Sequence, residues 1–400
     1  MVDVVASFLA SADAAADAVA GRALSPTVLT GRAAAVAACT GFPAAVSSPS
    51  QSPAWISAWA GETDPDLVVA MLSAEGRPQM ALALEIVRSG PFRVARFPGG
   101  RHANGNFPLF TASANVPPAA IGAMVAAIAK TRPDIDLLSL ERLAGTIDGV
   151  TNPLLALPHA PSPNLALAVD LDGGFEALLG RSSGKRKRKK HRSQTRKFEA
   201  AGGFRLITAA TPEDCDRLLS EFFAMKRDRF AKMGVADVFA EPSVKAFFRR
   251  LFVEALGAER PDFVLDALEV DGRLRAVTGS SRCGKRLICE FGAIREDDLA
   301  GASPGDFLFF ENIQRACNDG CSVYDFSVGD EPYKRLWCDI ETRQFDVLVP
   351  LTAKGRLLAL ARRTTNRAKT WVKSNRTLWA LVKKLRKRGG AEPQAAPAED

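Results

Sequence analysis

Three features that would place a chain in a membrane or outside the cell are missing from this 400-residue sequence. No run of about 18 uncharged apolar residues occurs, so we expect no membrane-spanning helix. The N-terminus lacks a basic leader region and carries Asp3, Asp13 and Asp17 among its alanines, which is unlike a secretory signal peptide. The seven cysteines are odd in number and lack the spacing of a disulfide framework, which favours reduced thiols and a cytoplasmic location.

Metal-ligand patterns are also missing. Cys317 and Cys321 are four residues apart, but no histidine or second cysteine pair lies near them, so core packing is the favoured interpretation and no metal site is expected. His102, in the segment GGRHANGNFPLF, is the one histidine in a setting that a functional site could use. A histidine on a surface loop is the simpler interpretation of it.

Length and composition predict a globular protein of two domains, with 47% hydrophobic and 24% charged residues. The charge is segregated. Residues Arg181–Lys197 hold ten Lys and Arg, residues Lys354–Arg388 hold thirteen, and neither stretch contains an acid. Removing these 23 charges from the formal net charge of +8 leaves −15 for the remainder. We therefore expect an acidic body with two basic segments, to which an anionic partner would bind.

Periodicity predicts an α/β fold in which one order of elements occurs twice. The first half should contain a helix from about Pro53, strands at Leu67–Leu72, Met80–Val87 and Phe92–Phe97, a helix at Pro117–Lys130 and a strand at Ile135–Leu140. A strand at Asn164–Leu171 should connect the halves. The second should contain helices at Glu213–Met233 and Pro242–Leu256, strands at Phe263–Val270, Arg273–Ser281 and Arg286–Ala293, a helix at Pro304–Asn318, and strands at Val323–Phe326 and Arg343–Val349.

The domain boundaries follow from this order. Residues 1–45 are an Ala-rich extension with one or two loosely docked helices or partial disorder, and residues 46–160 form the first domain. Residues 161–352 form the second domain, and residues 353–400 form a basic amphipathic tail with a disordered end.

The densest group of reactive side chains lies in CSVYDFSVGDEPYKRLWCD, residues 321–339. Val323–Phe326 favour a strand, which Gly329 and Pro332 end. The next positions hold Asp330, Glu331, Tyr333 and Lys334. A turn at the carboxyl end of a strand lies outside the core, so these groups can meet a substrate there. A solvated turn with an Asp–Lys ion pair fits the same pattern.

Three segments together resemble one family. The strand and turn YDF…GDEPYKRLW, the basic segment RSSGKRKRKKHRSQTRKFEAAGG and the segment FGAIREDDLAGASPGDFLFFENIQRA occur in the order shown by the GNAT-like acyltransferases typified by the bacterial cellulose-biosynthesis protein CelD. The resemblance covers about Gln51 to Pro350 and is strongest from Phe175 onward. It implies two tandem GNAT-like mixed-sheet domains, the first degenerate and the second carrying the cofactor site.

The resemblance also implies a co-substrate, acetyl-CoA or another acyl-CoA. Its pyrophosphate would lie at the start of the helix at Pro304, where Ser303 can cap the helix and Asp306 can complete a capping box. Its thioester would lie near Phe291–Ile294. The implied cofactor-binding residues are Phe291, Ala293, Ile294, Gly301, Ser303 and Gly305.

Catalytic roles are assigned on the same basis. Asp330 is the first candidate for the base, with Glu331, Asp325 and Glu290 behind it. Tyr333 could protonate the leaving thiolate, and Lys334 could hold an anionic substrate group or polarise the carbonyl. The acceptor would be an amine or hydroxyl of a small molecule or glycan precursor, in the biosynthesis of a cell-surface polysaccharide such as cellulose or an exopolysaccharide.

Two alternatives stay open. The Q/R-x-x-G-x-G/A form of the pyrophosphate loop is absent, and Fem-type relatives of the doubled fold use aminoacyl-tRNA, for which Arg181–Lys197 would be the binding surface. The third hypothesis is a non-catalytic protein tethered to a membrane by its tail. Trp371, Leu378, Val382 and Leu385 share one face of a basic helix, so residues 354–388 would bind either the anionic inner face of the membrane or the protein's own body.

Overall fold

The computed structural model describes residues 24–374 except 113 and 182. These residues form two compact units, unit 1 with residues 24–163 and 343–372, and unit 2 with residues 164–342. None of the helices in this range is long and apolar enough to cross a membrane.

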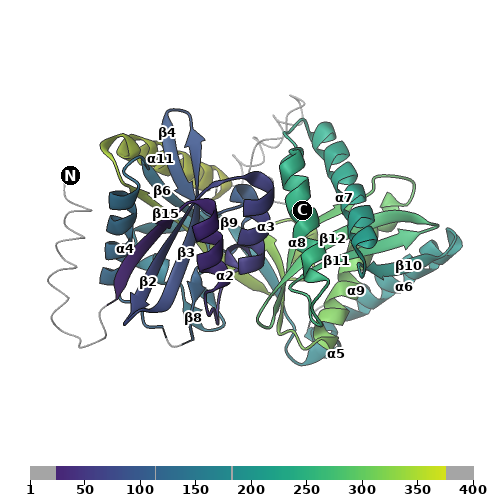
Figure 1. The fold of residues 1–400 in the computed structure, drawn as a ribbon. Coiled ribbons are helices and arrows are strands. Elements are labelled where there is room, and N and C mark those ends of the chain that lie inside the picture. The colour runs from purple at the N-terminus through teal and green to yellow at the C-terminus, as the bar shows by residue number, and fades with distance from the viewer. Residues whose placement is uncertain (1–23, 113, 182, 375–400) are drawn as a thin grey trace. The chain divides into compact units, whose positions relative to one another are not determined.

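Unit 1 is a mixed sheet with helices on both faces, and its strands follow the order β1-β2-β3-β4-β6-β15, with β5 beside β3. The strands are β1 (Ser25–Thr30), β2 (Asp66–Ala74), β3 (Arg77–Ser89), β4 (Phe92–Arg96), β5 (Leu109–Phe110), β6 (Leu137–Leu143) and β15 (Ile340–Pro350), and a separate hairpin joins β7 (Thr146–Ile147) to β8 (Val150–Thr151). Helices α2 (Arg32–Thr40) and α3 (Pro53–Thr63) cover one face, and α4 (Pro118–Thr131) covers the other (Figure 1). Helix α11 (Ala353–Ser374) packs through Ala359 on Leu137 and Leu348.

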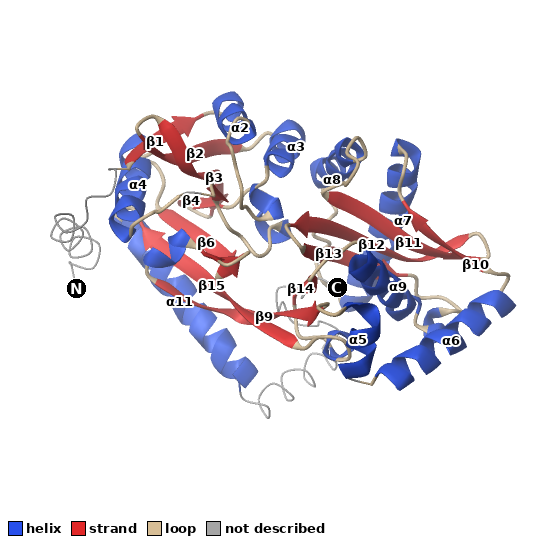
Figure 2. Ribbon diagram, turned by 90° about the horizontal axis from the view of Figure 1, so that it is seen from below, coloured by secondary structure: helices blue, strands red, loops and turns tan. Residues whose placement is uncertain are grey.

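Unit 2 has the strand order β9-β14-β13-β12-β11-β10. The strands are β9 (His159–Asp170), β10 (Phe204–Thr208), β11 (Phe263–Val270), β12 (Arg273–Cys283), β13 (Arg286–Ile294) and β14 (Val323–Val328), and the helices are α5 (Gly174–Arg181), α6 (Gly184–Ala200), α7 (Pro212–Met233), α8 (Pro242–Ala255), α9 (Pro304–Asn318) and α10 (Pro332–Arg335). Helices α7 and α8 cover one face of the sheet, and α5, α6 and α9 lie on the other (Figure 2). The hairpin expected at Asp271-Gly272 is present, and both residues have a positive φ, as a tight two-residue turn requires.

The two units repeat one order of elements. Unit 1 runs β1-α2-α3-β2-β3-β4-α4-β6, and unit 2 runs β10-α7-α8-β11-β12-β13-α9-β14. In each copy three antiparallel strands precede a helix, and the strand after that helix is parallel to the third of them. The predicted α/β fold of two tandem units is therefore confirmed. The first strand of each copy, β1 and β10, was not among the strands predicted from the sequence, because both are short and lie at a sheet edge.

The unit boundaries differ from the expected ones. Residues 24–45 do not form an extension, because β1 pairs with β2 over six positions and the side chains of Ala35 and Cys39 on α2 are buried. Strand β15, expected to close the second sheet, instead pairs with β6 of unit 1. Strand β9, which precedes the repeated elements β10 to β14 of unit 2, supplies the outer neighbour of β14. Each sheet is thus completed by a strand from beyond its own repeat.

The basic tail expected at residues 353–400 lies only partly within the described residues. Its first part belongs to unit 1, where Ala359 is buried and the Lys354 Nζ lies 3.3 Å from the Asp136 carboxylate. The helix continues to Ser374, and the apolar face expected from Leu378 to Leu385 lies outside the described residues.

Candidate active site

Strands β13 and β14 run parallel but pair only over three positions, from Arg286–Val323 to Ile288–Asp325. Beyond them β13 has a bulge at Glu290, because Ser280 of β12 pairs with Cys289 and Gly279 pairs with Phe291. Strand β14 has its own irregularity between Asp325 and Val328. The two strands therefore diverge, and residues 289–294 have no ladder partner on the side of β14 in the described chain. We call this edge the β13–β14 gap.

The bulge also decides which face each side chain occupies. Residues two apart on a regular strand share a face, but the extra residue reverses this alternation. Cys289 consequently packs with the residues beneath α9, whereas the Phe291 ring contacts Phe222 and Phe248 on α7 and α8. A Cβ at Gly279 would lie 2.2 Å from the Phe291 ring, so glycine is required there. Phe291 can contribute only backbone atoms to a ligand.

Helix α9 begins beside the end of β13. A Cβ at Gly305 would lie 2.8 Å from the Ile294 side chain, so a larger residue would push the helix away from the strand. Ser303 has a left-handed backbone (φ 57, ψ 63) and its side chain does not cap the helix, so the predicted capping box with Asp306 is wrong. The first-turn N–H groups of α9 therefore have no side-chain cap, and they form an anion-binding position next to the β13–β14 gap.

The basic helix α6 lies along the start of α9. The Gln194 side chain donates to the carbonyls of Ala302 and Ser303, each at 3.0 Å. The Lys190 Nζ lies 2.8 Å from the Asp306 carboxylate, so the one acid in the first turn of α9 is already neutralised. One side of α6 therefore contacts the protein, although the segment is rich in basic residues.

A second contact also shows that one side of α6 faces the protein. The Lys187 Nζ lies 4.8 Å from the centre of the Trp337 ring, and burial, with a smaller effect of Arg186, lowers the pKa of Lys187. Lys187, Lys190 and Gln194 are not among the site residues predicted from the sequence. Their spacing of three and four residues, continued to the buried Phe198, was the signal that one side of the basic segment faces protein.

The turn after β14 divides the four side chains that the sequence places together, because Lys334 and Glu331 pair with each other whereas Asp330 is exposed. The Lys334 side chain is 1% exposed, and its Nζ donates to the Val328 carbonyl at 2.9 Å and pairs with Glu331 at 2.8 Å. A role for Lys334 in binding an anionic substrate is therefore not supported, because its charge points into the protein. Asp330 is exposed and pairs with Arg335, which also pairs with Glu341.

The other catalytic candidates are partly buried. The Tyr333 ring stacks on Phe309 with a centroid distance of 5.6 Å and an interplanar angle of 5°. Asp325 pairs with Arg286 at 2.8 Å, which ties the two strands together before they diverge. Glu290 lies at the bulge itself and accepts a hydrogen bond from Ser281. Burial raises the pKa of the nearby Cys289 thiol to about 12, so Cys289 does not supply a thiolate.

The remaining cofactor candidates differ in what surrounds them. Ala293 and Ile294 are partly exposed at the end of β13, and the Ile294 side chain contacts the start of α9. Gly301 has open space where a Cβ would lie, so packing does not explain a glycine at that position.

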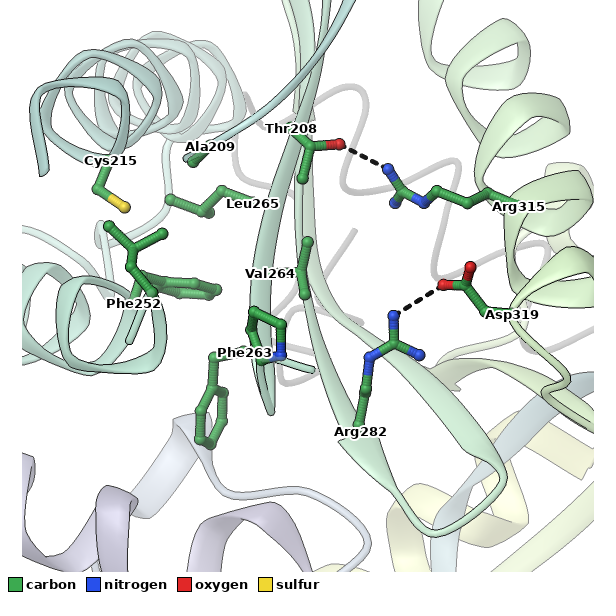
Figure 3. Close-up of a pocket in the computed structure, with 12 residues that line it drawn as sticks. Thr208, Ala209, Cys215, Phe252, Phe263, Val264, Leu265, Arg282, Arg315 and Asp319 are labelled. Carbon is green, nitrogen blue, oxygen red and sulfur yellow. Dashed lines mark hydrogen bonds and ion pairs between the residues drawn. The ribbon is translucent and has the colours of Figure 1, made fainter. Parts of the chain in front are cut away.

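A pocket of about 200 Å³ lies at the other end of α9 (Figure 3). Arg315 of this helix, about 17 Å from Pro304 at 1.5 Å per residue, and Asp319, directly after the helix, line it. Both of its arginines are paired, Arg315 with Thr208 and Asp266, and Arg282 with Asp319. Because its charges are neutralised and its remaining walls are mainly apolar, we assign this pocket to the packing of β10 and β11 rather than to catalysis.

Comparison with known proteins identifies the second unit. Residues 185–335 match the model of a family described as an acetyltransferase (GNAT) domain. No curated protein matches the sequence significantly. This segment of unit 2 is therefore similar to a GNAT domain, and it contains β13, β14 and α9, the elements around which the candidate site is built. The narrower resemblance to the CelD type stays a prediction.

Solved structures share the fold over about four-fifths of the chain. FemX is 11% identical, with a TM-score of 0.52 over 81% of this chain and 97% of its own. The C-terminal domain of a putative lysylphosphatidylglycerol synthetase from Agrobacterium fabrum is 13% identical, with a TM-score of 0.50 over 84% and 96%. A conserved protein of unknown function from Bacteroides thetaiotaomicron is 10% identical, with a TM-score of 0.51 over 80% and 99%. At these identities the likeness is one of fold alone.

Proposed function

We propose that this protein transfers an acyl group from coenzyme A to an amine or hydroxyl acceptor. The observation that supports this most is the uncapped start of α9 next to the β13–β14 gap, within the segment that matches a GNAT domain. Backbone N–H groups of the first turn of α9 would bind the pyrophosphate. The unpaired edge of β13 at Phe291–Ile294 would hydrogen-bond the amide-containing arm as a further strand would.

The acyl transfer needs a base and an acid. A carboxylate takes the proton of the attacking amine or hydroxyl, the acceptor bonds to the thioester carbonyl carbon, and the C–S bond then breaks to release the thiolate. Glu290 at the bulge and Asp330 on the turn are the two candidates for the base, and Tyr333 is the candidate that protonates the thiolate. Lys334 and Glu331 hold the turn in place.

The acceptor class rests on the resemblance of the turn GDEPYKRLW, which favours a glycan precursor in polysaccharide biosynthesis. A second function, transfer of an amino acid from tRNA, is favoured by one observation. Lys185, Arg186 and Lys189 are exposed on α6 and pair with no acid among the described residues. Replacing these three by glutamine should reduce tRNA affinity strongly at low salt if tRNA is the donor, and should change acyl-CoA affinity little otherwise.

The test is the thermal midpoint of the full chain with and without acetyl-CoA, CoA and longer acyl-CoAs, at two salt concentrations. A ligand at about a hundred times its dissociation constant should stabilise the protein by about 2.7 kcal/mol. Gly305→Val should abolish the shift, because the added methyl groups meet Ile294 and close the start of α9. Gly257→Val is the matched control, since the nearest atom to its Cβ is at 4.0 Å. An equal shift in both variants, or none in the wild type, contradicts the proposal.

A further inference from the structure

Unit 1 has a pocket of about 310 Å³ whose lining is dominated by arginine. We call it the arginine pocket. Its charged and polar lining residues come from β3, β4, β6, α11 and the segment 100–106: Arg88, Arg96, Arg101, Arg142, Arg362, Asn106, Ser139 and Glu141. Five guanidinium groups and one carboxylate therefore line the pocket, and Glu85, outside the lining, pairs with Arg96. The cations exceed these two acids by three.

The arginine pocket occupies the position in unit 1 that corresponds to the β13–β14 gap in unit 2. Strands β4 and β6 are parallel and pair only at Val94–Leu137 and Ala95–Leu138. The pocket residues Arg96 and Ser139 follow directly after these pairs, where the ladder ends. The same divergence of two parallel strands thus occurs in both units, and in unit 1 it is lined by cations.

The positions of the guanidinium groups are set by the protein. The Arg142 side chain donates to the carbonyl of Arg101 at 2.9 Å and to the Asn104 side chain, both of which are neutral. The Arg362 Nη1 donates to the buried Ser139 hydroxyl at 2.8 Å and lies 3.6 Å from Glu141. These contacts orient the two guanidinium groups without neutralising the pocket.

Arg96 lies against the loop of segment 100–106. Its Nε donates to Glu85 at 2.8 Å, and its guanidinium carbon lies 2.8 Å from where a Cβ at Gly100 would be. Because Gly100 has no side chain, the outer nitrogens of Arg96 fit against the loop beside Arg101. Among the described residues, no carboxylate pairs with Arg88 or Arg101. By contrast Arg132, elsewhere in unit 1, is paired with both Asp66 and Asp134.

We propose that the arginine pocket binds a soluble ligand through a multiply charged phosphate group, such as a pyrophosphate. A guanidinium group can donate two parallel hydrogen bonds to two oxygens of one phosphate. A cluster of cations that outnumbers its acids is stabilised by an anion of more than one charge. A single carboxylate can engage one or two of the five arginines, so it would bind more weakly. This site is built from unit 1 residues and stands independently of acyl transfer in unit 2.

The test is calorimetric titration of the full chain with sodium pyrophosphate, phosphate and acetate at constant ionic strength. We expect one saturable site with the affinity order pyrophosphate, phosphate, acetate. Arg101→Gln and Arg88→Gln should each weaken pyrophosphate binding by about tenfold or more, because each removes charge-assisted hydrogen bonds. Neither arginine has an acid partner, so the fold should persist, as a thermal midpoint would check.

Arg77→Gln is the matched control, because Arg77 is an exposed arginine of β3 outside the pocket. It should keep wild-type affinity within about twofold. The proposal fails if the wild type binds no pyrophosphate at millimolar concentration, or if Arg101→Gln and Arg77→Gln behave alike. Binding to phosphatidic acid vesicles without binding of pyrophosphate would assign the arginines to a membrane surface and also overturn it. Gly305→Val separates the two sites, since it should leave this affinity unchanged.

Discussion

Replacement of Lys334 by methionine tests whether the turn after β14 is held by a buried ion pair or used as a catalytic group. Methionine keeps the length of the stem and removes the charge. The change leaves Glu331, which is 17% exposed, without its cation, and leaves the Val328 carbonyl without its donor. Breaking a buried pair by removing one partner costs about 3–5 kcal/mol. For a unit of this size that corresponds to a fall of roughly 10 °C in thermal midpoint.

The assay is urea unfolding followed by tryptophan fluorescence, with the thermal midpoint as a second measure. Lys334→Met with Glu331→Gln should recover most of the loss, because no unpaired charge is then buried. Lys232→Met is the control, since Lys232 pairs with Glu296 at the surface and the pair should contribute less than about 1 kcal/mol.

One result would refute the reasoning. If Lys334→Met changed stability by less than about 1 kcal/mol but lowered kcat/KM by a hundredfold or more, Lys334 would be a catalytic group whose apparent burial is irrelevant to folding. Equal destabilisation by Lys334→Met and Lys232→Met would also contradict a special role for the buried pair.

Three further predictions concern other positions. Gly279→Ala should destabilise the protein by about 1–3 kcal/mol, because its Cβ meets the Phe291 ring, and Phe291→Leu in the same chain should recover part of this in urea unfolding. Burial raises the pKa of Asp346 to about 6, so its folded pKa exceeds its unfolded pKa, and stability should fall by up to about 3 kcal/mol as pH rises from 4 to 6.5, a slope absent in Asp346→Asn. Asp330→Asn should change the thermal midpoint little, since its pair with Arg335 is exposed, but should lower kcat/KM by about a hundredfold if Asp330 is the base and leave it intact if Glu290 is.

Much of the fold follows from local sequence. The strands Phe263–Val270 and the helix Pro304–Asn318 have the predicted bounds, because the hairpin turn and the proline at the first helical position are encoded by the residues themselves. The partners of edge strands are not encoded locally. Strand β15 pairs with β6, more than 200 residues earlier, and no periodicity within β15 distinguishes this partner from β14.

The candidate active site also combines features that local sequence predicts with features that only tertiary structure determines. The start of α9 was predictable because Pro304 marks it, whereas the position beside Phe291–Ile294 came from the family resemblance and the bulge at Glu290 was not predicted. It could not show that Lys334 points inward, since the direction of a side chain on a turn depends on the carbonyl and carboxylate that tertiary structure brings to it. The arginine pocket was invisible for the same reason. Its five cations are spread from residue 88 to residue 362, and only Arg362 belongs to a basic run of the sequence.

The last strand of the unit 1 sheet, β15, follows unit 2 in the chain, and this sets the order in which the two units can be completed during synthesis. The residues of unit 2, 164–342, leave the ribosome as one continuous stretch, with β9 already present to border β14. Unit 1 must wait, because β15 and α11 are made only after unit 2 is finished. Until then the edge of β6 is open, and edge strands of this kind are prone to pair with other chains. Arg362 arrives in this last segment, so the arginine pocket gains its full charge only when nearly the whole chain has been synthesised.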